Sequence, residues 1–215
     1  IWMLENLRYV PDAEDGYSNY THSALESATN KYYAYPGADG SYDPVLAESD
    51  WDKSWGILYN WAGATNGRST LANEGNTDYG GTYTQEQGIC PPGWHLPSDM
   101  EWSDLEEVIA GPGDWDDSYR TDNTWRSWSY GKKMKSTTAG GSSKSAAEGG
   151  FDALLVGRVY SGSRDALRFA TFFWSGSSYS GGTEAWRRNL ASGDPGVNRT
   201  HCNRSYLFSV RCKKD

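Results

Sequence analysis

One segment of the chain has a strong helical pattern of apolar residues. In residues 98–110 the apolar side chains recur every three or four positions, which places them on one face of a helix. These side chains are Trp102, Leu105, Val108 and Ile109. Ser98 and Glu101 have the spacing of a capping box, and Gly111 followed by Pro112 is typical of a helix end. The pattern therefore predicts a helix over residues 98–110.

The other apolar runs are short and predict strands. Four of them, in the second half of the chain, have the composition of strands and are separated by clusters of Gly and Ser. These runs are residues 151–159, 171–175, 185–190 and 206–213. Near the start of the chain, residues 2–9 alternate loosely and predict an edge strand, and residues 55–62 are the first strongly apolar stretch.

Long polar segments connect these runs. We predict a loop with short elements for residues 12–50 and loops for residues 63–88 and 111–150. The chain has no internal repeat and no linker between domains. The whole pattern predicts one α+β domain over residues 1–215, with a small mixed or antiparallel sheet, one or two helices and long loops.

The composition agrees with a loop-rich domain. Only 37% of the 215 residues are hydrophobic, yet the chain has 11 Trp, 15 Tyr and 25 Gly. Large aromatic rings bury much area each, so a few of them can anchor long irregular segments. We expect no direct insertion into a membrane, because there is no run of about 18 apolar residues. The chain starts at Ile1 without an initiator Met or a signal-peptide pattern, so we expect that its targeting information was trimmed away.

The net charge of -8 is distributed unevenly. Residues 1–157 hold ten Lys and Arg against twenty-four Asp and Glu, and residues 158–215 hold ten against four. One interpretation is an ordinary solvated surface. The other is a basic face on an acidic body, which would favour an acidic ligand. We expect no nucleic-acid partner, because no basic run alternates with aromatic residues as in known nucleic-acid-binding modules.

The three cysteines do not form a metal site. There is no CxxC pair, and the three histidines are scattered. Cys90 precedes the predicted helix and Cys212 lies in the last predicted strand, so a disulfide between them would join these two elements. It would stabilise the fold by about 4–5 kcal/mol on the chain-entropy model. Cys202 is then left over in a polar loop, either as a free thiol without a role or as a catalytic or copper-binding thiol.

No motif predicts catalysis or a bound cofactor. His95, Ser98 and Asp99 lie together in the sequence, but Ser98 is explained as the helix cap, so they do not predict a catalytic triad. The Glu-Pro-Asn, Gln-Pro-Asp and Trp-Asn-Asp motifs of calcium-dependent lectins do not occur. The Gly-rich stretches lack the Lys-Ser/Thr of a phosphate-binding loop. We therefore expect no metal, no cofactor and no enzymatic activity.

Several motifs, taken in order along the chain, support a family assignment. The longest is GICPPGWHLPSDMEW at residues 88–102. The shorter ones are WMLENLRY at 2–9, GILYNW at 56–61, FWS at 173–175 and FSVRC at 208–212. Together they resemble the Fibrobacter succinogenes major paralogous domain from end to end. The resemblance implies a C-type-lectin-like fold related to the formylglycine-generating enzymes, usually on secreted or surface-anchored proteins, without a firmly assigned activity.

The last third of the chain has a second resemblance. Its FWS and FSVRC motifs, with AWRRNL at residues 185–190 and VNR at 197–199, are similar to the variable region of proteins diversified by retroelements. In those proteins adenine-directed mutagenesis rewrites selected codons, and the altered side chains form a binding face on a fixed framework. Leu207 stands where the family typically has Gly, and bulky side chains at 168, 169 and 172 replace the usual Gly and Asn. Either randomised positions or ordinary divergence of a paralogue would explain these departures.

We therefore expect residues 158–215 to bind the ligand and residues 1–157 to serve as the scaffold. Trp174, Trp186 and Arg211 are the expected framework of the binding segment. Tyr and Arg lead the expected contacts because they give a large contact area or forked hydrogen bonding. The expected contacts are Tyr160, Arg164, Asp165, Arg168, Phe169, Phe172, Tyr179, Arg188, His201, Tyr206 and Leu207.

These observations together predict a non-catalytic ligand- or receptor-binding protein with a hypervariable face. We expect its partner to be a protein or glycan on another cell surface. We expect the protein itself to be extracellular, on a bacterial cell surface or a phage particle. One alternative is a secreted or surface carbohydrate-binding adhesin. Another is an oxidase of the formylglycine-generating type, which would need Cys202 and Cys212 as a reactive pair.

Overall fold

The longest helix in the described part of the computed structural model is α2 (Asp99–Ala110), where the sequence predicts it. The Ser98 side chain accepts a hydrogen bond from the Glu101 backbone N–H, and the Glu101 carboxylate accepts one from the Ser98 N–H. This confirms the predicted capping box, and Gly111 follows the last helical residue. The structure describes residues 1–20, 27–37, 51–67, 85, 87–126, 129–179 and 182–215.

The remaining described elements are short apart from three strands near the C-terminus. The other α-helices are α1 (Trp61–Ala64) and α3 (Tyr130–Met134). The 3₁₀ helices are η1 (Ala13–Asp15), η4 (Lys53–Trp55), η5 (Asp117–Arg120), η6 (Thr137–Ala139) and η7 (Ala146–Glu148). The strands are β1 (Tyr17–Asn19), β2 (Lys31–Ala34), β3 (Leu58–Tyr59), β4 (Trp94–His95), β5 (Trp125–Arg126), β6 (Val156–Tyr160), β7 (Ser163–Leu167), β8 (Ala170–Ser178), β9 (Glu184–Ala191), β10 (Val197–Asn203), β11 (Phe208–Ser209) and β12 (Lys213–Lys214).

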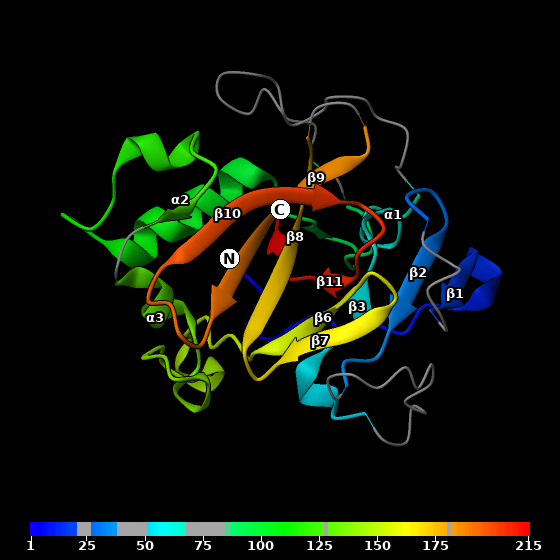
Figure 1. The fold of residues 1–215 in the computed structure, drawn as a ribbon, viewed down its shortest axis with the longest axis horizontal. Helices are drawn as coiled ribbons and strands as arrows, with labels where there is room; N and C mark the ends of the chain where they lie inside the picture. Colours follow the sequence, from blue (N-terminus) through cyan, green and yellow to red (C-terminus); the bar gives the residue numbers. More distant parts are fainter. Residues whose placement is uncertain (21–26, 38–50, 68–84, 86, 127–128, 180–181) are drawn as a thin grey trace.

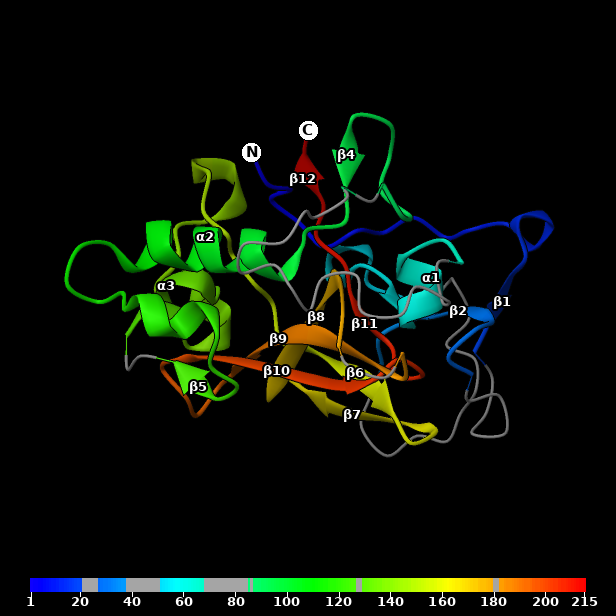
Figure 2. The same cartoon turned by 90° about the horizontal axis from the view of Figure 1, so that it is seen from above.

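An open, mixed sheet organises the described part of the chain. Its strand order is β1-β2-β3-β11-β8-β9-β10-β5, and the hairpin β6–β7 joins it beside β8. Strands β8, β9 and β10 pair antiparallel at its centre, with α2 and α3 towards one end and β1 and β2 towards the other (Figure 1). A second, two-stranded sheet of β4 and β12 lies close to both chain ends (Figure 2). The molecule is therefore an α+β protein with few helices, as the sequence predicts.

The strand predictions are only partly confirmed. Strands β8 and β9 form where runs 171–175 and 185–190 predict them. Run 151–159 forms a strand only in its last part, and β10 lies in a segment for which we predicted none. Elements β5 and α3 likewise interrupt the segment predicted as a loop over residues 111–150.

The predicted edge strand over residues 2–9 is wrong. Only Trp2 forms an isolated bridge there, to Lys213. The backbone hydrogen bonds of the segment are divided between two partners, because Met3 and Leu7 donate to the C-terminal segment while the Leu7 carbonyl accepts from Ile57. A continuous ladder to a single neighbour therefore does not form.

Tryptophan side chains anchor the centre of the sheet from different directions. Trp61 and Trp102 each donate an indole N–H to a backbone carbonyl of β8, at Ser175 and Trp174 respectively. Trp174 in turn donates to the carbonyl of Tyr59 at 2.8 Å. The three tryptophans are fully buried. Buried indoles need such hydrogen bonds, and these bonds fix the neighbouring loops to the sheet.

Two carboxylates on the inward face of α2 bind three arginines inside the protein. Asp99 pairs with Arg188 and with Arg199, and Glu106 pairs with Arg188 and with Arg126. The five side chains are at most 6% exposed. Arg188 and Arg199 lie directly opposite each other on β9 and β10, so these contacts fix the helix against both strands. We call these five residues the buried ionic network.

The ionic network predicts unfolding by acid. Burial alone would raise the pKa of Asp99, but the Arg188 and Arg199 guanidinium groups outweigh it and hold that pKa below its ordinary value. The pKa of Glu106 is lowered in the same way by Arg126 and Arg188, against the opposing effect of burial. A carboxyl group whose pKa is lower in the folded state stabilises that state above its unfolded pKa, and this contribution is lost as the pH falls.

We therefore expect the free energy of unfolding in urea to be lower at pH about 3 than at neutral pH, with the loss beginning near pH about 4. The Glu5→Gln variant is the control, because Glu5 is half exposed and pairs with Arg8 at the surface. Its pH dependence should match that of the parent protein. Equal stability of the parent at both pH values would contradict the prediction.

Candidate binding surface

The hairpin β6–β7 projects polar side chains beside the central strands. Ser161 and Gly162 form its turn with φ of 45° and 80°, the left-handed conformation that two-residue hairpin turns of this kind require. Arg158 lies directly opposite Asp165, and two hydrogen bonds of 2.7 and 3.1 Å join their side chains. Tyr160 comes just before the turn and is 38% exposed.

Strand register divides the side chains of β9 and β10 between two faces, because successive residues of a strand point to opposite sides. Arg188 and Arg199 are opposite each other and both contact Asp99 of α2. Arg187 is opposite Thr200 and therefore points the other way. We call this second side the outer face. Its in-register members are Trp125, Phe172, Trp174, Arg187, Asn189, Asn198 and Thr200, of which Phe172, Trp174 and Asn189 are buried. In Figure 2 helix α2 and the hairpin β6–β7 lie on opposite sides of β9 and β10.

Guanidinium groups and aromatic rings alternate where the hairpin meets the outer face. The Arg158 guanidinium lies 4.4 Å from the centre of the Tyr160 ring and 4.6 Å from that of Phe172. The Arg187 guanidinium lies 5.0 Å from the centre of the same Phe172 ring. Tyr206 packs against Tyr160 with 4.6 Å between ring centres. Such contacts fix the positions of both guanidinium groups.

Arg187 lacks the carboxylate partners that Arg126, Arg188 and Arg199 have in the buried ionic network. Its Nε and Nη1 atoms are covered from solvent and have no hydrogen-bond partner among the described residues. Burial lowers the pKa of Arg187, and the Cys202 thiol that it contacts opposes this shift. Burial in turn raises the pKa of that thiol to about 12, so Cys202 is neutral at physiological pH and is a weak partner.

A second aromatic group lies at the far end of β9 and β10. The rings of Tyr179 and His201 stack with 3.5 Å between their centres, and the Trp186 ring stands edge-on to both. His201 Nδ1 lies 3.0 Å from a carboxylate oxygen of Glu184. Beneath this group the Arg199 guanidinium lies 3.6 Å from the centre of the Trp186 ring.

The predicted contact residues divide into two classes. Seven are exposed or half-buried, and the structure brings them together in three groups: Tyr160 with Asp165 and Tyr206, Tyr179 with His201, and Arg168 with Phe169 at the β7–β8 turn. Phe169 is 66% exposed. The framework residues Trp174, Trp186 and Arg211 are buried, as expected.

Four predicted contacts need correction, because their side chains are buried in the folded protein. These are Arg164, Phe172, Arg188 and Leu207. Arg188 belongs to the buried ionic network, and Arg164 donates a hydrogen bond to the carbonyl of Tyr35 at 3.0 Å. Phe172 stacks on Phe208, and Leu207 packs in an apolar cluster with Val156 and Val159. A ligand on the surface does not reach these side chains.

Of the two interpretations of the uneven charge, burial disfavours the basic face. Half of the basic residues of 158–215 are buried: Arg164, Arg188, Arg199, Arg204 and Arg211. Two of them neutralise carboxylates of the acidic scaffold inside the protein. The excess positive charge of the C-terminal segment is therefore largely internal.

The predicted contacts do not include several residues of the candidate surface, among them Trp125, Arg158 and Arg187. Trp125 lies in the segment predicted as a loop, and it is 40% exposed beside Asn198. The alternation of a strand could have identified Arg187, because Trp186 and Arg188 on either side of it share the opposite face.

The residues His95, Ser98 and Asp99 have three separate roles, which leaves no catalytic triad. Ser98 caps α2, and Asp99 binds Arg188 and Arg199. His95 is buried, with Nε2 3.0 Å from Glu101 and Nδ1 2.8 Å from Asp215. Among the described residues no three His, Cys, Asp or Glu side chains are placed to hold a metal ion. None of the described helices is long and apolar enough to cross a membrane.

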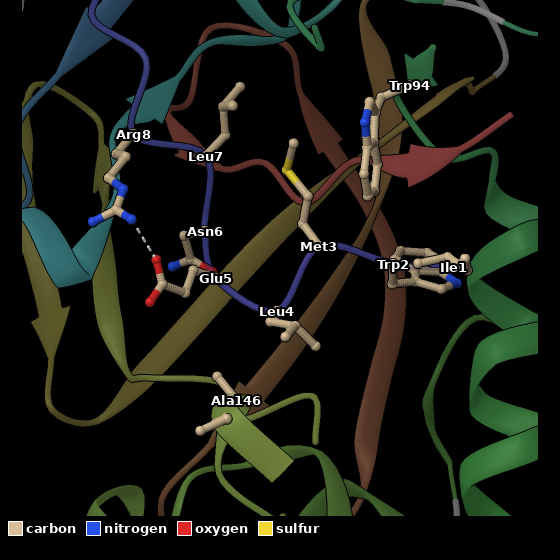
Figure 3. Close-up of a pocket in the computed structure, with 11 residues that line it drawn as sticks. Ile1, Trp2, Met3, Leu4, Glu5, Asn6, Leu7, Arg8, Trp94 and Ala146 are labelled. Atoms are coloured by element: carbon tan, nitrogen blue, oxygen red, sulfur yellow. Dashed lines mark ion pairs between the residues drawn. The ribbon is translucent and has the colours of Figure 1, made fainter. Parts of the chain in front are cut away.

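An open groove of about 730 Å³ runs along residues 1–8 (Figure 3), and no outer-face residue lines it. Trp94 and Ala146 form part of its lining. The charged side chains in the lining, Glu5 and Arg8, pair with each other at 2.8 Å. The groove is therefore mainly apolar, and it contains none of the predicted contact residues.

Comparison with known proteins identifies one family. The model of the Fibrobacter succinogenes major domain matches residues 1–214, which is nearly the whole chain. No curated protein and no solved structure matches the chain.

Proposed function

Because the chain belongs to the Fibrobacter succinogenes major domain family, we propose that it has a C-type-lectin-like fold and is a non-catalytic ligand- or receptor-binding protein. Its binding side chains are the exposed or half-buried ones of the outer face, the hairpin β6–β7 and the β7–β8 turn, and they exclude the buried Arg164, Phe172 and Asn189. They vary on a fixed interior, as in the variable proteins of diversity-generating retroelements. The ligand is a protein or glycan on another cell surface.

The observation that carries this proposal is the division of β9 and β10 into two faces. Arg188 and Arg199 are fixed by buried carboxylates on one face. Arg187, Asn198 and Thr200 on the other face have no part in that network. Outer side chains can therefore be exchanged without leaving a buried charge unpaired, which a diversified binding protein requires.

The disulfide supports a location outside the cell. Cys90 and Cys212 are bonded, with 5.9 Å between their Cα atoms, which confirms the predicted bridge. Structural disulfides persist mainly in oxidising compartments. We therefore keep the bacterial cell surface or a phage particle as the proposed location.

The cysteines argue against the oxidase alternative. A reactive pair of Cys202 and Cys212 would require both thiols, but Cys212 is bonded to Cys90. The remaining thiol, Cys202, has its pKa raised by burial, which disfavours the reactive thiolate. We therefore propose binding rather than catalysis.

The nucleotide sequence around the gene tests the diversification. We expect a neighbouring reverse-transcriptase gene and a near-identical repeat of the 3′ coding region that differs from it at adenines. The differences should fall on codons of outer-face and turn residues and spare those of Arg188 and Arg199. A gene without such a repeat would overturn this part of the proposal. Binding to neutral glycans on an array, lost when Trp125 or Tyr160 is replaced, would then favour the adhesin.

A pair of phenylalanines provides a test of the fixed interior. We expect Phe169→Ala to change the free energy of unfolding by at most about 0.5 kcal/mol, because the side chain is 66% exposed. We expect Phe172→Ala to cost about 3 kcal/mol, because its ring stacks on Phe208 in the core. Urea unfolding of the two variants measures both values. Similar losses in the two variants would show that the turn is part of the core.

A further inference from the structure

Arg187 occupies the middle of the outer face. On one side it is opposite Thr200 of β10, and on the other it is opposite Trp174 of β8. Trp125, at the β5 edge of the sheet, and Tyr160, in the hairpin, are both exposed aromatic side chains. Arg187 is half-buried as a residue, and its strand β9 lies between β5, which carries Trp125, and β8, beside which the hairpin with Tyr160 lies.

The charged neighbour of Arg187 on this face is already paired. Arg158, whose guanidinium contacts the same Phe172 ring, is held by Asp165. Arg187 itself has two N–H-bearing nitrogen atoms, Nε and Nη1, without a partner among the described residues. Leaving a buried charged donor unsatisfied costs free energy, and an acceptor on a bound ligand would recover that cost.

A carboxylate is the acceptor that matches this group. The guanidinium fork binds a carboxylate through two parallel hydrogen bonds, which no single hydroxyl or carbonyl oxygen can do. The molecule as a whole carries a net charge of -8, so a densely charged polyanion would be repelled at long range. An isolated carboxylate in neutral surroundings avoids this repulsion.

We propose that Arg187 binds the carboxylate of an Asp or Glu side chain of a protein partner, with Trp125 and Tyr160 packing against apolar atoms around it. This inference rests on the proposed function and names the partner chemistry of the same surface. A central Arg between exposed aromatic rings is the composition of energetic hot spots in protein–protein interfaces. The side chain must turn away from Phe172 for Nε and Nη1 to reach the ligand, because both atoms are covered in the free protein.

A matched pair of small probes tests the proposal on the intact chain. N-acetyl-glutamate methylamide and its glutamine counterpart differ only in the charge and donor pattern of the side chain. In an NMR titration we expect the glutamate probe to shift the Arg187 Nε–H signal and the Trp125 indole signal in a saturable way. We expect the glutamine probe to bind at least about tenfold more weakly, because a hydrogen bond to a charged group is lost.

Substitutions of Arg187 assign the effect to its side chain. Arg187→Gln should weaken glutamate binding about tenfold, and Arg187→Lys should give an intermediate loss because it keeps the charge without the fork. Arg8→Gln is the matched control, since Arg8 is an exposed arginine in the N-terminal segment. It should leave the titration unchanged. If Arg187→Gln fails to fold, the comparison of the two probes on the parent protein still decides the proposal.

Equal binding of the two probes, or unchanged binding in Arg187→Gln, would overturn the proposal. Methyl glucuronide carries a carboxylate on a sugar and serves as a third probe. If it binds more tightly than the glutamate probe, the partner is an acidic glycan and the protein assignment is wrong. These binding results do not depend on the gene context. A gene without the template repeat would contradict the proposed diversification, but it would not contradict carboxylate binding by Arg187.

Discussion

Replacing Arg188 with methionine should lower the free energy of unfolding by about 4 kcal/mol, because it leaves Asp99 and Glu106 short of a partner inside the protein. Both carboxylates are fully buried, so water cannot take the place of the lost guanidinium. Methionine keeps much of the volume of the side chain, and the loss therefore measures charge pairing rather than a cavity. Urea unfolding at neutral pH gives the value.

Arg8→Met is the matched control for this prediction. Arg8 is half exposed and pairs with Glu5 at the surface, so its loss should change stability by less than about 0.5 kcal/mol. A cost below about 1 kcal/mol for Arg188→Met would contradict the buried ionic network as an element of stability. The same experiment also distinguishes a structural role of Arg188 from a ligand contact. If Arg188 only contacted a ligand, its replacement would not lower the free energy of unfolding.

The predicted helix formed because its signals are local. The capping box of Ser98 and Glu101 and the terminal Gly111 act within one or two turns of the chain, so no distant contact is needed to place α2. Helix α3, by contrast, contains Gly131, and a Cβ atom there would lie only 1.9 Å from the carbonyl oxygen of Gly196. In the sequence this glycine favours a loop, whereas in the fold it permits close contact between two segments far apart in the chain.

The candidate surface was predictable in its location but not in its side chains. Arg187 and Arg188 are adjacent and chemically identical in the sequence, and they point to opposite faces of β9. Which of them is buried depends on Asp99 and Glu106 of α2, about ninety and eighty residues away in the chain. A count of charges along the chain cannot distinguish an arginine that neutralises the interior from one that faces a ligand.

The disulfide should give the second large effect on stability. Cys90 and Cys212 are separated by 122 residues in the sequence, and the bridge joins the segment before α2 to the segment before β12. The chain-entropy model predicts that the Cys90→Ala/Cys212→Ala double variant loses about 4–5 kcal/mol in the free energy of unfolding. Both cysteines are buried, so alanine rather than serine avoids adding an unsatisfied polar group.

Cys202→Ala serves as the control for the disulfide, because Cys202 is the free cysteine of the chain. Its loss should cost much less, since no loop is closed by it. Thiol titration of the unfolded, unreduced parent should find one reactive thiol of the three cysteines. Three reactive thiols, or a double variant as stable as the parent, would show that the bridge does not form in solution. One reactive thiol, together with a large loss in the free energy of unfolding of the double variant, would confirm the bridge. Strands β9 and β10 pack against α2, which follows the bridged Cys90, so the stability of the binding surface would then depend on an oxidising environment.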